Sequence, residues 1–272
     1  MAPAPLIRSA RNPAVAHVRS LQRGSARRRA SHTVVEGPKL VAEALRAGVV
    51  VSVLCVDNPS PAAAAVADEA AAQGHSVRHC TDRVFNAVAD TETPQGVLAV
   101  IATPDPPPLP DSALLLVLDA VQDPGNVGAM VRSAAAAGVT GVICTPGTAD
   151  AHSPKAMRAG AGGQFRVPIR KLSESEDLEA FAAGVDLYAA SADADLAYHD
   201  VDWTGPSGLI VGAESAGVSP AWRSASRAAV RVPMQREVES LNAAAAAAVI
   251  LFEAARQRAA GYTNKDPGAG AH

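Results

Sequence analysis

The sequence predicts an α/β protein of two domains, the larger one built on a mostly parallel sheet with helices on both faces. Continuous apolar runs, such as residues 49–56 and 209–212, are typical of strands that are buried on both faces. Helical patterns alternate with these runs, as they do in proteins with a parallel sheet. Five prolines lie within residues 103–111, where neither a helix nor a central strand can continue, because proline lacks an N–H and fixes φ. We therefore expect a domain boundary there.

The first domain is expected over residues 1–103. Its strands are predicted at 32–36, 49–56, 77–79 and 97–102. Its helices are predicted at 12–22, 61–73 and 82–89. Gly74 is expected to end the second helix, and Asp82 is expected to cap the third.

The second domain is expected over residues 112–262, after a proline-rich linker at 104–111 that should be extended and semi-rigid. Its strands are predicted at 113–118, 141–144, 187–190, 209–212 and 229–232. Its helices are predicted at 127–137, 153–158, 178–183 and 241–258. Residues 263–272 are expected to be disordered.

The composition excludes several classes of protein. Hydrophobic residues make up 48% of the chain and charged residues 19%, so the chain can bury a core. Its three cysteines lie far apart without a Cys-x-x-Cys pair, which excludes a disulfide scaffold and a typical zinc module. The sequence contains no uninterrupted run of about 18 apolar residues, which argues against a membrane span. We expect a cytoplasmic protein with no metal site and no membrane partner.

Charge is distributed unevenly along the chain. The net charge is −3, yet the first 35 residues hold seven arginines and no acid, which leaves −10 for the remainder. A basic arm of this kind can bind phosphates, because each neutralised phosphate releases a counterion. Arg27, Arg28 and Arg29 are the expected RNA contacts. A frayed, solvated terminus and a mitochondrial transit peptide are the alternative interpretations.

Three segments lie where a parallel α/β sheet places its ligands, beyond the carboxyl ends of strands. In the first, a strand ends before Asp123-Pro-Gly-Asn126, and Arg132 follows on the next helix. In the second, residues 209–217 join a buried strand to a glycine-bounded loop that carries Glu214. Each of these two segments also fits an ordinary turn or a loop-stabilising acid.

The third segment, residues 230–242, leads into the last helix. Ser240 could cap that helix. Asn242 is less easily explained there, because asparagine is a mediocre helix residue. Free N–H groups at the helix start can receive the polar groups of a ligand.

Together and in this order, the three segments resemble the SpoU/TrmH branch of the SPOUT superfamily, which comprises AdoMet-dependent RNA ribose 2′-O-methyltransferases. The matching residues are Asp123-Pro-Gly-Asn-Val-Gly128 with Arg132, Gly212-Ala-Glu-Ser-Ala-Gly217, and Val232-Pro-Met234 with Glu239-Ser-Leu-Asn242. This resemblance covers residues 114–258. Residues 36–45 and 93–97 are similar to the ribosomal-protein-like RNA-binding domain of that family.

The resemblance implies a SPOUT α/β fold with a deep C-terminal trefoil knot, preceded by a small α/β RNA-binding domain. It also implies S-adenosyl-L-methionine (AdoMet) as the cofactor. The residues at cofactor-binding positions are Gly212, Val232, Met234 and Leu241.

The catalytic residues implied by the resemblance are Arg132, Asn126, Glu214, Ser240 and Asn242. Arg132 would assist deprotonation of the ribose hydroxyl, and the other four would orient Arg132, the ribose and the cofactor. The family acts as a homodimer in which the partner contributes this arginine.

The leading functional hypothesis is methylation of a ribose 2′-hydroxyl in 23S ribosomal RNA, because the first domain resembles a ribosomal protein. A transfer-RNA 2′-O-methyltransferase is an alternative of the same class. A non-catalytic RNA-binding or ribosome-assembly factor would not need Asn126, Arg132, Glu214 and Asn242. A nicotinamide enzyme lacks its fingerprint, since the first segment has glycines only at 125 and 128.

Overall fold

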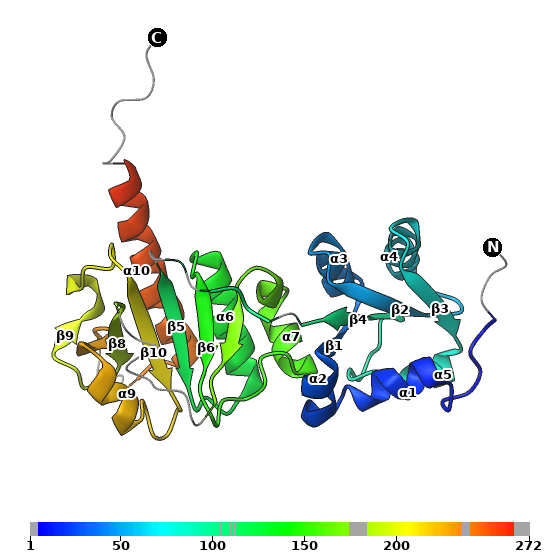
Figure 1. Ribbon diagram of the computed structural model, residues 1–272, viewed down its shortest axis with the longest axis horizontal. Coiled ribbons are helices and arrows are strands. Elements are labelled where there is room, and N and C mark those ends of the chain that lie inside the picture. The colour runs from blue at the N-terminus through cyan, green and yellow to red at the C-terminus, as the bar shows by residue number, and fades with distance from the viewer. Residues whose placement is uncertain are drawn as a thin grey trace, which may run out of the picture. The chain divides into compact units, whose positions relative to one another are not determined.

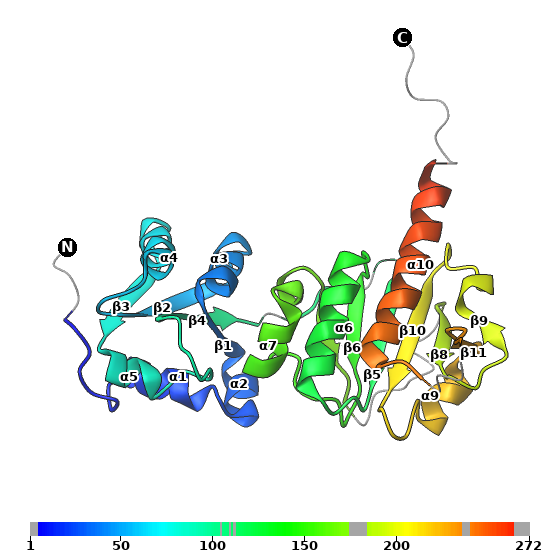
Figure 2. The same ribbon diagram turned by 180° about the vertical axis from the view of Figure 1, so that it is seen from behind.

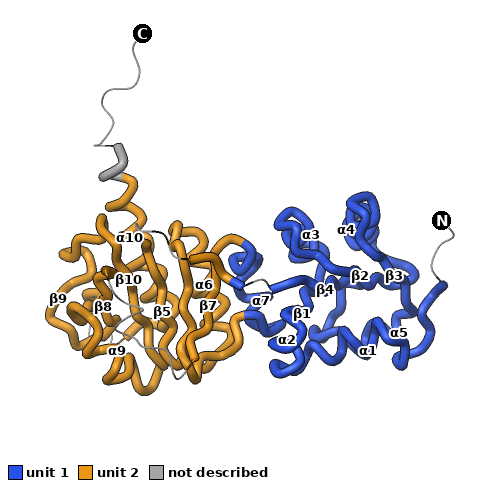
Figure 3. Tube along the Cα trace, in the orientation of Figure 1, with its two compact units in different colours: residues 1–105, 152–165 blue, residues 106–151, 166–272 orange. Residues whose placement is uncertain are grey.

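A computed structural model describes residues 5–103, 105–108, 110, 113–173, 184–235 and 240–263, with side chains up to residue 259. The chain forms two compact units (Figure 3). Unit 1 comprises residues 1–105 and 152–165, and unit 2 comprises residues 106–151 and 166–272. The helix predicted at 178–183, the tail beyond residue 263 and parts of the predicted linker lie outside the described residues.

Unit 1 is built on a mixed four-stranded sheet in the order β1-β4-β2-β3 (Figure 1). The strands are β1 (His32–Glu36), β2 (Val50–Val56), β3 (Ser76–Cys80) and β4 (Val97–Ala102). Strand β4 runs antiparallel to β1 and β2, whereas β3 runs parallel to β2. All four strands were predicted, with ends that differ by no more than one residue.

Helices cover both faces of this sheet. Helices α3 (Pro38–Arg46) and α4 (Pro61–Ala72) share one apolar core with alternate residues of β1, β2 and β4. Helices α1 (Pro13–Ser20) and α5 (Asp82–Asn86) pack on the opposite face. The side chains of Asn12 and Ser60 cap α1 and α4 by accepting backbone N–H groups.

Three local features of unit 1 differ from the sequence prediction. Helix α2 (Gly24–Ala30) lies between α1 and β1, where no helix was expected. Helix α3 was not predicted either. Thr81, not Asp82, is the N-cap of α5, so Asp82 lies inside the first turn.

Residues 152–165 were predicted inside the second domain, but the structure places them in unit 1. Helix α7 (Pro154–Gly160) inserts the fully buried Met157 into the core that α3 and α4 share. The Thr33 hydroxyl on β1 donates to the carbonyl oxygen of His152 at 2.6 Å. The short 3₁₀ turn η1 (Gly163–Phe165) completes this segment.

Unit 2 has a seven-stranded sheet in the order β7-β6-β5-β10-β8-β11-β9, and every described pair of neighbours is parallel. The strands are β5 (Leu114–Asp119), β6 (Gly141–Cys144), β7 (Ile169–Lys171), β8 (Asp186–Ala190), β9 (Leu196–Ala197), β10 (Ser207–Gly212) and β11 (Ala228–Arg231). All residues of the central strands β5 and β10 are buried, as their continuous apolar runs predict. The prediction of a mostly parallel sheet is confirmed, although β7 and β9 were not expected.

Helices α6 (Pro124–Ala136) and α10 (Ala243–Thr263) lie side by side on one face of this sheet (Figure 2). Helix α9 (Pro220–Ala225) packs Trp222 on the other face, and the 3₁₀ turn η2 (Tyr198–Asp200) follows β9. Arg258 fastens α10 to the sheet, since its guanidinium donates to the carbonyl oxygen of Trp203 at 2.9 Å and to the Ser207 hydroxyl at 3.1 Å. Among the described helices, none is long and apolar enough to cross a membrane.

Candidate active site

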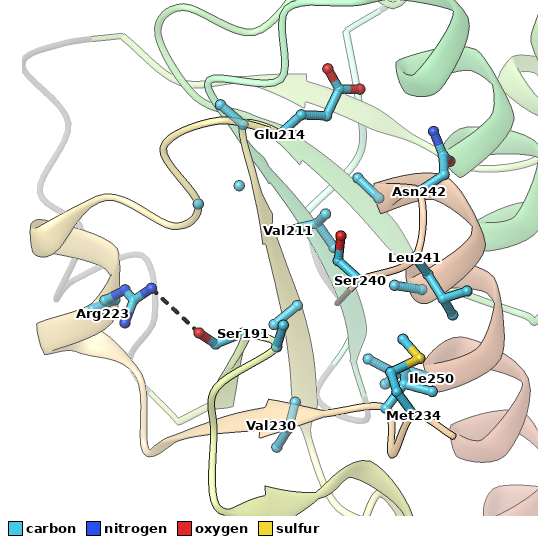
Figure 4. A pocket seen from close by; sticks show the side chains of 18 residues that line it. Ser191, Val211, Glu214, Arg223, Val230, Met234, Ser240, Leu241, Asn242 and Ile250 are labelled. Atoms are coloured by element: carbon cyan, nitrogen blue, oxygen red, sulfur yellow. Dashed lines mark hydrogen bonds between the residues drawn. The ribbon is translucent and has the colours of Figure 1, made fainter. Parts of the chain in front are cut away.

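Three neighbouring strands of unit 2 end at one cavity. Strands β8, β10 and β11 are connected by parallel pairing, so their carboxyl ends lie at the same edge of the sheet. The loops that follow them, together with the first turns of α10, enclose about 420 Å³ (Figure 4). This volume lies within the range of about 300–1,000 Å³ that is usual for small-molecule sites.

The lining of this cavity is mainly apolar. Val211, Val230, Met234, Leu241 and Ile250 supply apolar side chains, as Figure 4 shows. Val232 is a further apolar lining residue. The other lining residues are small, polar or charged: Ala190, Ser191, Ala192, Gly212, Ala213, Glu214, Gly217, Arg223, Ser240, Asn242, Ala243 and Ala246. All four predicted cofactor-binding residues, Gly212, Val232, Met234 and Leu241, therefore lie at one cavity.

The loop after β10 folds back tightly on itself. The Gly217 amide donates to the carbonyl oxygen of Ala213 at 2.7 Å. A Cβ atom at Gly212 would lie only 2.1 Å from the carbonyl carbon and oxygen of Gly217. A side chain at position 212 is therefore incompatible with this loop, which explains the glycine.

A buried carboxylate holds the far end of the same loop. Asp119, at the end of β5, is only 4% exposed. One of its oxygens accepts the Ser219 amide at 2.7 Å, and the other accepts the Thr145 hydroxyl at 3.1 Å. Asp119 thus fixes the chain between β10 and α9 against the neighbouring strands.

Three predicted catalytic residues form one hydrogen-bonded cluster. Asn126 comes from the first turn of α6, Glu214 from the loop after β10, and Asn242 from the start of α10. The Asn126 side-chain amide donates to the Glu214 carboxylate. The Asn242 amide donates to the side-chain oxygen of Asn126 at 3.2 Å. Three distant segments thus meet at the cavity edge.

The cap of α10 differs from the prediction. The Asn242 side-chain oxygen accepts the amides of Ala244 at 2.9 Å and Ala245 at 3.3 Å, which is the pattern of an N-cap residue. Asn242, not Ser240, therefore caps the helix, and its low helix propensity is no longer an anomaly. Ser240 lines the cavity (Figure 4), and Glu239 lies outside the described residues.

Arg132 stands apart from this cluster. It lies on α6 with an exposed side chain and is not among the residues that line the cavity. Within the described part of the chain, no hydrogen bond or ion pair occupies its guanidinium. The sequence singled out this arginine, but among the described residues it has no hydrogen bond to the cluster and does not line the cavity.

The three predicted RNA contacts separate into two kinds. Arg27 is only 7% exposed, and its guanidinium donates to the carbonyl oxygens of Leu21 and Gln22 at 2.9 Å each. The expectation for Arg27 is therefore corrected: it joins α2 to the end of α1. Arg28 and Arg29 are exposed.

Two polar residues that line the cavity, Ser191 and Arg223, were missed by the sequence analysis. Ser191 was not among the predicted site residues, yet it directly follows β8 and lines the cavity. The Arg223 guanidinium donates to the Ser191 hydroxyl at 3.4 Å (Figure 4). The position of Ser191 beyond a strand end could have identified it, whereas no local pattern distinguishes Arg223.

All three cysteines are buried. All three are free thiols, and burial raises the pKa of Cys55 to about 11 and that of Cys80 and Cys144 to about 12. Within the described ranges, no cluster of three or more His, Cys, Asp or Glu residues could hold a metal ion.

Comparison with known proteins decides the family. Residues 113–252 match the model of the SpoU rRNA Methylase family, and residues 12–99 match the MRM3-like substrate binding domain. The chain belongs to the SpoU rRNA methylase family. The match to the SpoU model contains every element that lines the cavity, including the first turns of α10.

The chain is also similar to a named RNA methyltransferase and to solved methyltransferase structures. The chain is 35% identical over 252 residues to the 23S rRNA (guanosine(2553)-2′-O)-methyltransferase RlmP of Bacillus subtilis, covering 90% of this chain and 97% of that protein. It is similar to the AdoMet-bound SpoU methyltransferase AviRb from Streptomyces viridochromogenes, with 30% identity and a TM-score of 0.79 over 92% of this chain and 100% of AviRb. An AdoMet-bound rRNA methyltransferase from Sinorhizobium meliloti gives 28% identity and a TM-score of 0.80 over 93% of this chain and 97% of that one.

The cavity of this SpoU family member fits AdoMet chemically. Its apolar side chains suit an adenine ring, and its glycine-bounded loop allows backbone groups to approach a ligand. Of the lining residues that the structure describes, Arg223 and Glu214 are the two charged ones. A ligand with an apolar ring at one end and ionised groups at the other matches this lining.

Proposed function

We propose that this protein transfers a methyl group from AdoMet to a ribose 2′-hydroxyl of 23S ribosomal RNA. The observation that carries the proposal is the meeting of Asn126, Glu214 and Asn242 at the edge of an apolar cavity. The substrate is inferred from the printed activity of RlmP, which is similar along nearly its whole length.

Gly212, Val232, Met234 and Leu241 would hold the cofactor, mainly through apolar contact and backbone groups. Bound AdoMet supplies a methyl group that its sulfonium already activates. The remaining tasks of the protein are alignment of the sugar and help with the hydroxyl proton. The cluster of Asn126, Glu214 and Asn242 is linked through side-chain hydrogen bonds, which favours one fixed arrangement beside the cavity.

Arg132 would polarise the ribose hydroxyl and anchor the adjacent phosphate. A guanidinium has a pKa above about 12 and presents five N–H donors, so it acts better as a fixed cation than as a base. Its exposed position away from the cavity favours action on a partner subunit. Ser240, which lines the cavity, would help to orient the cofactor.

The active form would be a homodimer. On α10, Val249 and Phe252 are 38% and 50% exposed, and their spacing of three residues places them on one side of the helix. Exposed apolar side chains beside α6, the helix that carries Arg132, suit a second copy of the chain.

The C-terminal third of unit 2 would form the deep trefoil knot of the SPOUT fold. Strand β10 lies between β5 and β8, although β8 precedes it in the chain. This order, with cavity residues before and after positions 236–239, supports the proposal.

Unit 1 would bind the RNA. Arg28 and Arg29 are exposed on α2 and can neutralise phosphates, whereas Arg27 is engaged in the fold.

Methyl transfer from labelled AdoMet to 23S rRNA tests the function. We expect Arg132→Ala to lower the rate by at least about a hundredfold, because removal of one preorganised donor at a reacting oxygen costs about 10²–10³-fold. AdoMet affinity, measured by calorimetry, should stay within about twofold because Arg132 does not line the cavity. Label in transfer RNA alone would show that the substrate assignment is wrong, and full activity of Arg132→Ala would show that its assignment is wrong.

Mixed dimers test whether Arg132 acts on the partner. Leu241→Arg would fill the apolar cavity and prevent cofactor binding in its own subunit. We expect each variant to be inactive alone, and a mixture of Arg132→Ala with Leu241→Arg to recover part of the activity, because one site then has both parts. A mixture that forms dimers yet stays inactive would contradict action across the interface.

A further inference from the structure

We infer that Arg223 is the residue that recognises the α-carboxylate of AdoMet and thereby fixes the direction in which the cofactor enters the cavity. The inference rests on the AdoMet site described above and concerns a residue outside the three sequence motifs. Arg223 lies on α9, which packs on the opposite face of the sheet from α10. Its side chain nevertheless lines the same cavity.

Charge is the first argument. Among the described residues that line the cavity, Arg223 is the one cation and Glu214 is the one anion. The Glu214 carboxylate already accepts the Asn126 amide, which places it with the cluster at the start of α10. AdoMet carries a carboxylate, an ammonium and a sulfonium on one side of its adenosine. A carboxylate in this cavity therefore has one cationic side chain to pair with.

Geometry is the second argument. The Arg223 Nε donates to the carbonyl oxygen of Val218 at 3.2 Å, and one Nη donates to the Ser191 hydroxyl at 3.4 Å. The Ser191 hydroxyl in turn donates to the Asp193 carboxylate. These contacts use two of the five guanidinium N–H groups, and among the described residues no further partner takes the others. The guanidinium is thus held in place with donors left for a ligand.

Position is the third argument. Figure 4 shows Arg223 and Ser191 at one side of the cavity and Leu241, Ile250 and Met234 at the other. A Cβ atom added at Gly217 would lie 3.5 Å from an Arg223 Nη atom, so the guanidinium lies close to the loop after β10. The charged side suits the methionine moiety, and the apolar side suits the adenine ring. Arg223 thereby determines which end of AdoMet occupies which side.

Decarboxylated AdoMet provides the decisive probe, because it keeps the adenosine, the sulfonium and the ammonium and lacks the carboxylate alone. Binding of each ligand to the full-length protein is measured by calorimetry without RNA. We expect the native protein to bind AdoMet about tenfold more tightly than the decarboxylated probe, because only AdoMet can form the charge-assisted hydrogen bond between its carboxylate and the Arg223 guanidinium. In Arg223→Gln, AdoMet affinity should fall about tenfold while affinity for the probe stays unchanged. Arg223→Lys should restore part of the preference because it keeps the charge.

Arg227→Gln is the matched control. Arg227 is an exposed arginine of the following segment, pairs with Asp186 at 2.6 Å and does not line the cavity, so this variant should bind both ligands as the native protein does. Thermal unfolding of each variant reports whether it is folded. Equal weakening of both ligands in a folded Arg223→Gln, or no weakening of either, would overturn the inference. A higher KM for RNA with unchanged AdoMet affinity would also overturn it, by assigning Arg223 to a phosphate. A native protein that binds neither ligand would instead refute the cofactor site itself.

Discussion

The two units each contain a hollow of about 420 Å³, but the two hollows are built differently. In unit 2, the parallel strands β8, β10 and β11 end at one edge, so three loops converge and enclose an apolar lining. In unit 1, the antiparallel β4 separates β1 from β2, and the hollow lies beside α3 and α7. Strand direction, not volume, therefore distinguishes the two.

The two hollows also differ in the charged residues that line them. The hollow of unit 1 is lined by Lys39, Arg46 and Arg158 as well as by Glu36 and Glu43. Arg46 pairs with Glu43, and Arg158 pairs with Asp90 at 2.6 Å, so most of this charge is balanced locally. In the described part of its lining, the cavity of unit 2 has one cation and one anion among mainly apolar residues. A mainly apolar cavity with a few fixed polar groups is the usual form of a cofactor site.

The largest effect is expected from adding a side chain at Gly212, where the loop after β10 folds back on itself. Gly212→Ala places a Cβ atom 2.1 Å from the backbone of Gly217, so the loop must move and the cavity must change shape. We expect AdoMet affinity to fall more than tenfold and the free energy of unfolding to fall by about 1–3 kcal/mol, as for other overpacked sites. Calorimetry and urea unfolding measure the two effects.

Gly205→Ala is the control for that variant, because a Cβ atom at Gly205 meets nothing within 4 Å. It should leave both quantities unchanged. If Gly212→Ala bound AdoMet normally, the loop after β10 would not define the cofactor cavity.

A smaller effect separates the two tasks of Asn242. Asn242→Ala removes the cap of α10 and the donor to Asn126, so the free energy of unfolding should fall by about 1 kcal/mol and the rate of methyl transfer about tenfold. Asn242→Asp keeps a capping oxygen and replaces the amide donor by a carboxylate oxygen, which cannot donate to Asn126 and adds a negative charge. It should retain stability in urea unfolding yet transfer methyl groups as slowly as Asn242→Ala. Normal activity of Asn242→Asp would show that the cluster needs no amide at this position.

The smallest effect is expected on the surface of unit 1. Replacing Arg28 and Arg29 by glutamine should weaken RNA binding a few-fold and reduce the salt dependence of binding by about one unit of slope per lost phosphate contact. Stability should not change, because both side chains are exposed. Filter binding over a salt series measures the slope, and Arg227→Gln in unit 2 serves as the control. An unchanged slope would place the RNA on another face.

Local signals in the sequence were sufficient for most of the fold. Continuous apolar runs identified β2, β4, β5, β6 and β10, because these strands are buried and their residues carry the information themselves. The short edge strands β7 and β9 were missed, since three and two residues give no pattern to detect. Helix α3 was missed although Pro38 stands at its first turn, a usual place for proline.

The candidate site was predicted in part for the same reason. Asn126, Glu214 and Asn242 each follow a strand or begin a helix, and strand ends in a parallel sheet lie together. The sequence analysis named Ser240 as the possible cap of α10, although asparagine is an equally good capping residue. The structure chose Asn242 by placing its oxygen 2.9 Å from the Ala244 amide.

The sequence by itself determined the α/β class, the parallel sheet and the residues that meet at the cavity edge, because each depends on short-range patterns. Only the tertiary structure decided that Arg27 is buried, that Met157 joins the core of unit 1, and that Arg223 lines the cavity of unit 2. Each of these depends on contacts between segments far apart in the chain. The sequence does not distinguish an arginine whose guanidinium is enclosed by carbonyl oxygens from one whose guanidinium is open to a ligand. Only the packing around the side chain distinguishes these two cases.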